Sequence, residues 1–256
     1  MCDNSVCLQL GSAMKLPRSG NIIKRLMNPL SRNTKSRELN YGNPNPKYSE
    51  KILTVAFWDI KNFSVLCNIL KSHPSLLVSF LREFLEMSRY IICKHDGTLD
   101  KFLGDGAMGI FGFRGQTKSS TTNAAICAVV SALQLRDAFN SRQSVWMKLW
   151  NGHVTDRISI GLKCGINTGY ATTFDDNESV HRTQFTAVGN TVNIARRLTD
   201  ICGSSQIIIS GGTESKIRSQ FEISRIGIVT DLKNIQGSYE IFNVVRIKQV
   251  ETTAKF

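Results

Sequence analysis

The sequence contains no long apolar segment. None of its apolar runs reaches the length of about 18 residues that a transmembrane helix requires, and no continuous apolar stretch typical of a signal peptide lies near residue 1. The CxxC spacing typical of zinc and redox sites is also absent, because the seven cysteines are scattered along the chain. These absences argue against a transmembrane protein and against a disulfide-linked secreted one. They favour a cytoplasmic protein with reduced thiols.

The usual signatures of nucleic-acid-binding domains are absent as well. We find neither zinc-finger spacing nor the aromatic signature of an RNA-binding sheet. The chain has a formal net charge of +12, and residues 1–50 hold eight Lys and Arg against three Asp and Glu. A basic excess of this size suits a polyanionic ligand, a membrane surface or simple solubility equally well. We therefore predict no specific nucleic-acid partner.

Proline is scarce, and its distribution indicates where the folded domain begins. Four of the five prolines lie in residues 1–50, among Ser and Asn. We interpret residues 1–50 as a basic tail or linker, in which only residues 21–30 have the apolar spacing of a short helix. Residues 51–247 are predicted to form one domain with a single core, followed by a C-terminal tail at residues 248–256.

The spacing of apolar residues predicts the order of the elements in this domain. Helices are expected at residues 74–93, 121–139 and 190–202, and strands at residues 53–60, 99–103, 107–111, 158–166, 170–174, 183–188, 207–209, 222–229 and 239–245. Residues 167–169 are expected to form a turn and residues 175–182 a charged loop. The order β-α-β-β-α-β indicates an α+β fold with a ferredoxin-like core, extended by further strands and helices into a mixed sheet with helices packed on it.

Two acidic residues lie at the ends of predicted strands. Asp59 follows the apolar run of residues 53–58, and Asp105 lies between two glycines at the tip of a predicted hairpin, where little covers its carboxylate. Either residue alone is equally compatible with a solvated surface charge or, for Asp59, with a helix N-cap. If both strands are central in one sheet, the two carboxylates lie close together and repel each other. A divalent cation between them is the simplest explanation.

A further pair of polar residues lies on a predicted helix. Asn193 and Arg197 are spaced i, i+4, so they share one helix face. On its own this spacing is also typical of an exposed polar face.

Three motifs together resemble the catalytic domain of class III nucleotidyl cyclases. They are Phe57-x-Asp59-Ile60-x-x-Phe63, Lys101-x-x-Gly104-Asp105 and Gly189-Asn190-Thr191-Val192-Asn193-x-Ala195-x-Arg197. They occur in the family's order and at its approximate spacing, and the resemblance covers residues 51–247. It implies an enzyme in which the ribose 3′-OH of a nucleoside triphosphate attacks its own α-phosphate, releasing a 3′,5′-cyclic nucleotide and pyrophosphate.

The resemblance implies roles for the residues around the two acids. Asp59 and Asp105, helped by the backbone carbonyl of Ile60, would hold two Mg²⁺ or Mn²⁺ ions per site. Backbone amides of three residues would face the triphosphate: Asn62, Phe63 and Ser64. Lys233 resembles the lysine that meets the terminal phosphates, although the family's flanking glycine is missing.

The same resemblance assigns the residues that would hold the nucleoside. Asn193 would orient the ribose, and Arg197 would stabilise the charge that grows on the α-phosphate. Lys101 and Thr186 match the positions that recognise the purine. An ammonium group suits the acceptor N1 of adenine, and family members that select guanine have an acid at the Lys101 position. Because the Thr186 hydroxyl can both accept and donate, we expect it to discriminate weakly.

These assignments favour an adenylyl cyclase that acts as a homodimer. In this family the site forms between two head-to-tail domains, one supplying the acids and the other the base-recognition pair, the Asn and the Arg. This chain carries both halves, which implies a symmetric dimer with two shared ATP sites. The alternatives are a guanylyl cyclase and a non-catalytic nucleotide-binding domain of a signalling protein. The presence of all four family residues counts against the latter: Asp59, Asp105, Asn193 and Arg197.

Two residues near the first acid depart from the family pattern. Trp58 replaces the small residue usual before the metal-binding Asp, and Asn62 replaces a Gly where the backbone approaches phosphate. A side chain at residue 62 is expected to crowd this loop. Neither substitution removes a catalytic group.

Overall fold

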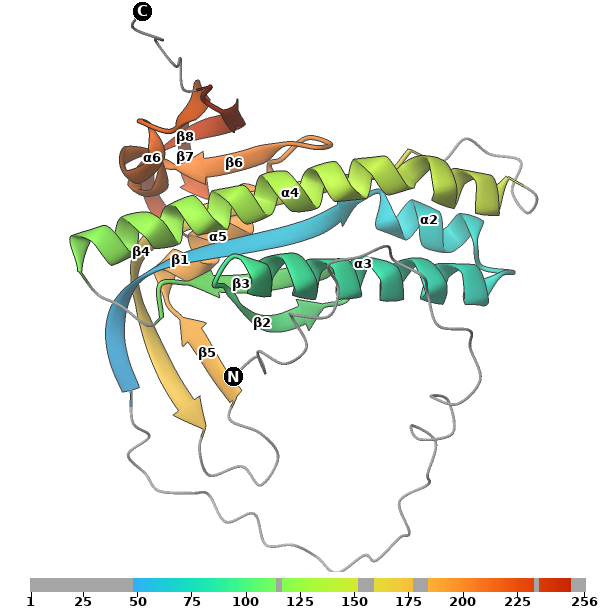
Figure 1. Cartoon of the computed structure of the whole chain (residues 1–256), viewed down its shortest axis with the longest axis horizontal. Helices are drawn as coiled ribbons and strands as arrows, with labels where there is room; N and C mark the ends of the chain where they lie inside the picture. Colours follow the sequence, from blue (N-terminus) through green and yellow to red (C-terminus); the bar gives the residue numbers. More distant parts are fainter. Residues whose placement is uncertain (1–47, 114–116, 152–158, 177–183, 233–234, 250–256) are drawn as a thin grey trace, which may run out of the picture. The chain divides into compact units, whose positions relative to one another are not determined.

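The computed structural model describes residues 48–113, 117–151, 159–176, 184–232 and 235–249, which form an eight-stranded mixed sheet with helices packed on it (Figure 1). The strands are β1 (Tyr48–Lys61), β2 (Thr98–Leu103), β3 (Gly106–Phe111), β4 (Gly161–Asp176), β5 (Gln184–Val188), β6 (Ile207–Ser210), β7 (Phe221–Leu232) and β8 (Ile235–Ile247). The helices are α2 (Phe63–Ile69), α3 (Pro74–Lys94), α4 (Lys118–Trp150), α5 (Asn190–Asp200) and α6 (Gly211–Ile217). The predicted α+β fold with its β-α-β-β-α-β core is confirmed.

The sheet is organised around β1. Its order is β2-β3-β1-β4-β6-β8-β7, with β5 paired to β4 off this path. β1 pairs antiparallel with β3 on one side and with β4 on the other, whereas β4 and β6 are parallel. The residues at the end of β1 therefore lie beside both the β2–β3 hairpin and the start of β4.

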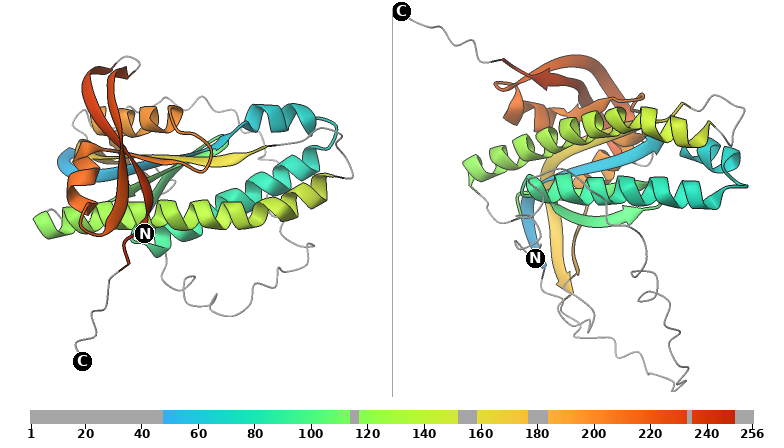
Figure 2. Two further views of the ribbon diagram at one scale, coloured as in Figure 1. Left: turned by 90° about the horizontal axis from the view of Figure 1, so that it is seen from above. Right: turned by 45° about the vertical axis from the view of Figure 1, so that its right-hand side comes forward.

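Alternation along β1 assigns its side chains to two faces of the sheet. Ala56, Trp58 and Ile60 belong to the larger core cluster with α3 and α4. Leu53, Val55 and Phe57 belong to a second cluster, with Ala195 of α5. Figure 2 shows α3 and α4 on one side of the sheet and α5 on the other. By the same alternation, residue 59 faces the side of α5.

Trp58 fits this arrangement because its side chain lies in the core, on the opposite face from Asp59. Trp58 is fully buried, and a Cβ on Gly109 of β3 would lie only 3.0 Å from its ring. The indole N–H has no hydrogen-bond partner among the described residues. The bulky residue that departs from the family pattern is thus accommodated by a glycine on the neighbouring strand, away from the acids.

Two local expectations are wrong. α4 continues past residue 139 to Trp150, because Trp146 and Trp150 both pack edge-on against Phe80 of α3, at centroid distances of 4.8 and 5.4 Å. Residues 167–169 form no turn, because β4 runs through them while paired with β1. The apolar spacing predicts neither of the short helices α2 and α6, and it predicts a first strand that begins at residue 53, whereas β1 begins at Tyr48.

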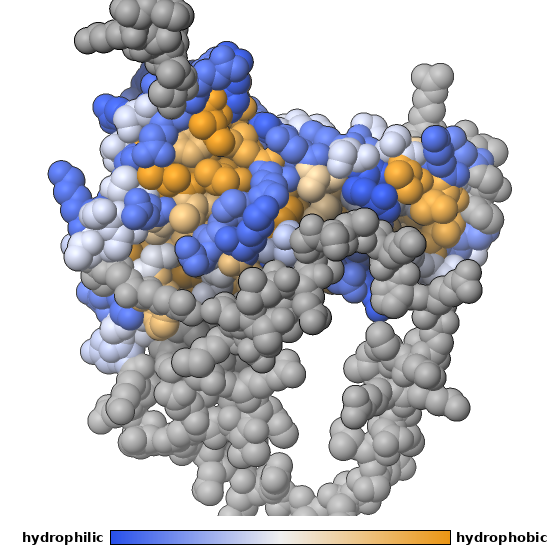
Figure 3. Space-filling model, viewed as in Figure 1, coloured by the Kyte–Doolittle hydropathy of each residue, from blue (hydrophilic) through white to orange (hydrophobic). Residues whose placement is uncertain are grey.

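The surface combines charged and apolar areas. On the face shown in Figure 3, apolar side chains gather over α6 and the C-terminal strands and again near α2. Exposed apolar residues of these elements include Ile228 of β7 and Val65 of α2. Exposed apolar residues are ordinary on protein surfaces, so these areas identify no partner. None of the described helices has the length and apolar character needed to cross a membrane.

Candidate active site

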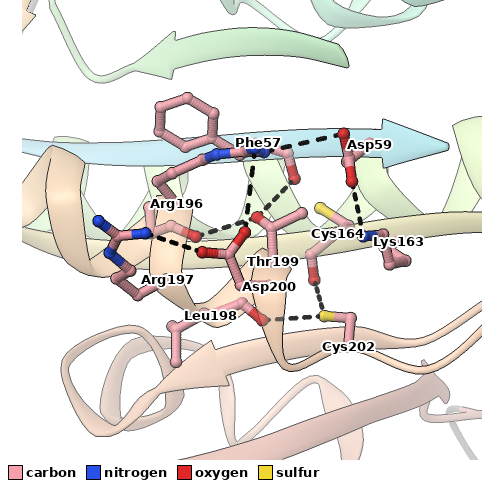
Figure 4. A network of polar contacts seen from close by, with 11 residues as sticks. Phe57, Asp59, Lys163, Cys164, Arg196, Arg197, Leu198, Thr199, Asp200 and Cys202 are labelled. Carbon is pink, nitrogen blue, oxygen red and sulfur yellow. Dashed lines mark hydrogen bonds and ion pairs between the residues drawn. The ribbon is translucent and has the colours of Figure 1, made fainter. Parts of the chain in front are cut away.

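Asp59 lies near the end of β1 and is held by two basic residues of its own chain. Lys163, its cross-strand partner on β4, places Nζ 2.6 Å from Asp59 Oδ2, and Arg196 of α5 places Nη1 3.8 Å from Oδ1. Figure 4 shows both side chains converging on the carboxylate. The side chains of Asp59 and Lys163 are 16% and 15% exposed, so this charge pair is largely removed from water. Neither Lys163 nor Arg196 belongs to the motifs that point to the site in the sequence.

Asp105 lies beside Asp59 because of the register between β1 and β3. Gly106, the residue after Asp105, pairs directly with Asp59. A Cβ at Gly106 would lie 2.7 Å from the Trp58 carbonyl oxygen and 3.6 Å from Asp59 Oδ1, so the hairpin approaches β1 closely at this point. Burial and the negative charge of Asp59 raise the pKa of the Asp105 carboxyl. The fold thus brings the two predicted acids together.

This pair of carboxylates suits a hard divalent cation. Carboxylate oxygens are the side-chain ligands that Mg²⁺ and Mn²⁺ prefer, and Mg²⁺ is commonly bound by one or two carboxylates together with substrate phosphates and water. Among the described residues, no group of three or more His, Cys, Asp or Glu side chains could hold a metal ion. A cation at Asp59 and Asp105 would therefore need further oxygens, for which the backbone carbonyl of Ile60 and a bound nucleotide are the candidates.

The segment predicted to face the triphosphate forms the start of α2. Asn62 is the N-cap residue and adopts a left-handed conformation, with φ of 64°, which Asn tolerates better than most residues. Its side-chain Nδ2 donates to the Ser159 carbonyl oxygen at 2.8 Å, so the amide is turned toward Ser159. Phe63 is partly buried against the core and Ser64 is exposed. Lys233 lies outside the described residues.

Helix α5 carries Asn193 and Arg197 and is anchored to the sheet by hydrogen bonds. The Thr199 hydroxyl is 3.0 Å from the Ala195 carbonyl oxygen and 3.4 Å from that of Phe57 on β1. The Cys202 thiol, just after the helix, donates to the Cys164 carbonyl oxygen of β4 at 3.1 Å. Burial raises the pKa of the Cys202 thiol to about 12, so it remains protonated as a donor. These contacts, visible in Figure 4, fix the helix against β1 and β4.

Arg197 of the described chain pairs with Asp200 rather than with either of the two predicted metal-binding acids. Arg197 Nη1 is 3.0 Å from Asp200 Oδ2, whereas the neighbouring Arg196 extends to Asp59. No ion pair between Arg197 and Asp59 or Asp105 is found in the described part of the chain. Asn193, one turn earlier on the same helix face, is exposed. In the described part of the chain, Arg197 is therefore not paired with the acids that its own chain brings together.

The two predicted base-recognition residues are in contact. Lys101 Nζ of β2 lies 3.2 Å from Thr186 Oγ1 of β5. A third residue joins them, since the carboxylate of Asp100 lies 3.1 Å from both Lys101 Nζ and Thr186 Oγ1. Asp100 was not predicted from the sequence, because its approach to Thr186 depends on the pairing of strands that are far apart in the sequence.

Comparisons with known proteins agree on one family. A family model described as the adenylate and guanylate cyclase catalytic domain matches residues 46–244. Adenylate cyclase 1 of Rhizobium meliloti is 26% identical over 205 residues, which cover 78% of this chain and 29% of that protein. The chain spans between 9% and 37% of the length of three adenylate cyclases that it matches.

Solved structures show the same fold. The crystal structure of the adenylyl cyclase CyaB from P. aeruginosa is similar with a TM-score of 0.66 at 28% identity, over 79% of this chain and 98% of that one. The guanylyl cyclase Cya2 has a TM-score of 0.67 at 22% identity, over 81% of this chain and 97% of that one, which is a likeness of fold alone. Structures named as an adenylyl cyclase and as a guanylyl cyclase both share this fold, so the fold alone does not distinguish the two types.

Proposed function

The chain belongs to the family of adenylate and guanylate cyclase catalytic domains, and on that premise we propose that it converts ATP to 3′,5′-cyclic AMP and pyrophosphate. The observation that carries this proposal is the juxtaposition of Asp59 and Asp105 at the end of β1. Two carboxylates held close together in a partly buried setting are costly unless a cation or a reaction uses them.

The proposed reaction is an intramolecular phosphoryl transfer. The 3′-oxygen bonds to the α-phosphorus, the bond from that phosphorus to the pyrophosphate oxygen breaks, and the hydroxyl proton is released. Asp59, Asp105 and the carbonyl of Ile60 would hold two Mg²⁺ or Mn²⁺ ions. When bound, such ions favour ionisation of the hydroxyl and neutralise charge on the phosphates.

The protein's own residues would position the nucleotide and stabilise the transition state. The amides of Asn62, Phe63 and Ser64 would bind the triphosphate, with Lys233 at its terminal phosphates. Asn193 would orient the ribose, and Arg197 would neutralise the charge that grows on the α-phosphate.

We further propose that the site is shared between two copies of the chain. Arg197 pairs with Asp200, and among the described residues it makes no ion pair with Asp59 or Asp105 of its own chain. A head-to-tail homodimer would supply the acids from one copy and the base-recognition residues, Asn193 and Arg197, from the other. Each of the two sites would then hold one complete set of groups, with the acids from one copy and the remaining residues from the other.

Adenine is the base that the contact between Lys101 and Thr186 supports. The Lys101 ammonium can donate to N1 of adenine, whereas guanine presents a donor at the same place. A buried polar group left unpaired costs about 1–3 kcal/mol, which corresponds to a preference of about 5- to 150-fold.

Cyclic product is the direct test of this function. Purified protein is incubated with Mn²⁺ or Mg²⁺ and with ATP or GTP, and cyclic nucleotide and pyrophosphate are measured. Asp105→Ala serves as the inactive control. Cyclic AMP in amounts matching pyrophosphate supports the proposal, and cyclic GMP as the main product contradicts the choice of base.

A second candidate, a domain that binds nucleotide without turnover, is favoured by one observation. Lys163 already neutralises Asp59 at 2.6 Å, so a cation must compete with an ion pair of the same chain. If this candidate is correct, ATP binds to the protein but no cyclic nucleotide forms with either Mg²⁺ or Mn²⁺.

Complementation tests the shared site. Arg197→Ala alone should lower the rate by about 10²–10³-fold with little loss of ATP binding, because it removes a transition-state donor. Asp59→Ala alone should be inactive. A mixture of the two variants should regain activity, because one of the two sites in each mixed dimer keeps every group. A mixture that stays as inactive as its parts, while subunits demonstrably exchange, rules out the shared site.

A further inference from the structure

Asp100 is the most deeply buried member of the polar cluster formed by Asp100, Lys101 and Thr186. Its side chain is 1% exposed, against 46% for Lys101. Its Oδ2 accepts from the Thr186 hydroxyl and from the Lys101 ammonium, both at 3.1 Å. Buried carboxylates are retained only where donors satisfy them, and here both donors are groups expected to contact the purine.

An irregularity in β2 places Asp100 in this cluster. Neighbouring residues of a regular strand point to opposite faces of the sheet, so Asp100 and Lys101 would be directed apart. The pairing of β2 with β3 shifts register between Leu99 and Lys101, and Asp100 is the residue left unpaired. A bulge of this kind redirects a side chain and is frequent near functional sites. It allows both residues to reach Thr186 on β5.

The cluster fixes the direction of the Thr186 hydroxyl. A carboxylate has no proton to donate, so the single hydroxyl proton of Thr186 is directed to Asp100. Lys101 donates to the same oxygen at 3.2 Å. Two hydrogen-bonding groups of the pair remain available: a lone pair on Thr186 Oγ1 and an N–H of Lys101. One acceptor and one donor are therefore presented to a ligand.

We propose that Asp100 is a positioning residue that makes this site select adenine, an inference that rests on the proposed function. Adenine presents an amino donor at C6 and an acceptor at N1, which match the lone pair of Thr186 and the N–H of Lys101. Guanine presents the reverse pattern, with an acceptor at C6 and a donor at N1. A free threonine hydroxyl could rotate to suit either base, and Asp100 removes this freedom.

Binding of two nucleotides that cannot cyclise tests the proposal. Calorimetry with 3′-deoxy-ATP and 3′-deoxy-GTP in Mg²⁺ gives a ratio of dissociation constants that is independent of turnover. The wild-type chain should prefer the adenine nucleotide by about 5-fold or more, and Asp100→Asn should lower that preference to about 2-fold or less, because Asn can donate to Thr186 and turn its hydroxyl proton toward the base. Asp137→Asn removes a carboxylate that is 67% exposed on α4 and should leave the ratio unchanged.

A double-mutant cycle shows whether Asp100 acts through Thr186. Thr186→Val removes the hydroxyl, so adding Asp100→Asn to it should not change the ratio further. Thermal melts of the same samples report folding, and Asp100→Ser replaces Asp100→Asn if the latter does not fold. The inference is overturned if Asp100→Asn keeps the wild-type ratio, if its effect is undiminished in the Thr186→Val background, or if the wild-type chain shows no preference. A wild-type chain that prefers the adenine nucleotide but forms no cyclic AMP from ATP contradicts the proposed function alone.

Discussion

The ionised carboxylate of Asp105 in the proposed site lowers the stability of the folded protein. Burial and the neighbouring charge of Asp59 raise its pKa, so the folded protein binds a proton at this carboxyl more tightly than the unfolded chain does. The stability of the folded protein therefore falls as pH rises from the pKa of this carboxyl in the unfolded chain through its pKa in the folded protein. This loss of stability persists at neutral pH. A divalent cation bound between the acids would offset it.

Asp105→Asn should therefore stabilise the protein in the absence of metal. In EDTA at pH 7 we expect a Tm higher by about 1–3 °C, with the gain shrinking as pH is lowered through the folded pKa. Mn²⁺ should raise the Tm of the wild-type chain but not that of the variant. Differential scanning calorimetry measures both effects, with Asp137→Asn as the matched loss of one exposed carboxylate. An Mn²⁺-induced shift of equal size in the variant would contradict a cation site at Asp105.

Sequence motifs predicted some residues of the candidate site, whereas the others could be identified only from the register of the strands. Asp59, Asp105 and Lys101 stand out because each lies next to a recognisable strand end or turn. Lys163 and Asp100 do not, since one is defined by lying opposite Asp59 on β4 and the other by a bulge in β2. Single-sequence patterns contain neither the register between distant strands nor the position of a bulge.

At the level of elements, α5 depends on a glycine of β4. A Cβ at Gly165 would lie 2.3 Å from the Thr199 amide nitrogen and 2.4 Å from the Ala195 carbonyl oxygen, both backbone atoms of the helix. No rotamer change can relieve such a contact. Gly165 thus sets the closest approach of the helix that carries Asn193 and Arg197.

Gly165→Ala should consequently displace α5 and destabilise the domain. Overpacking of this kind costs about 1–3 kcal/mol or more, and we expect a Tm lower by about 5–10 °C together with loss of most activity. Gly211→Ala at the start of α6 is the matched control, because its Cβ would meet only atoms 3.9 Å away. Equal melting temperatures for the two variants would contradict the described packing of α5 on β4.

Apolar periodicity predicted most elements but not their extent. The predicted helix at residues 74–93 agrees with α3 because Pro74 and a regular apolar face define it. The end of α4 was missed because the contacts of Trp146 and Trp150 with Phe80 are tertiary. The expected turn at residues 167–169 was wrong because Asn167 is buried, where it donates to the Thr191 carbonyl oxygen at 3.0 Å and accepts from Ser210 at 2.6 Å.

At the level of the whole molecule, the proposed site requires two chains. The described residues of one chain bring Asp59 and Asp105 together and direct Arg197 elsewhere. Activity per chain should then depend on the concentration of the protein. At concentrations below the dissociation constant of the dimer, activity per chain should rise in proportion to concentration. At concentrations above this constant, activity per chain should become constant. Sedimentation velocity at the same concentrations measures the fraction of dimer.

Adding inactive chains distinguishes dissociation of the dimer from simple loss of activity on dilution. Excess Arg197→Ala added to dilute wild-type protein should restore activity, because the variant's acids complete a site with the wild-type Arg197. The double variant Asp59→Ala/Arg197→Ala should pair equally well but complete neither site, so it should suppress activity instead. Two outcomes would show that one chain holds a complete site. One is activity per chain that stays constant when the sample is diluted until it is monomeric, and the other is restoration of activity by both variants alike.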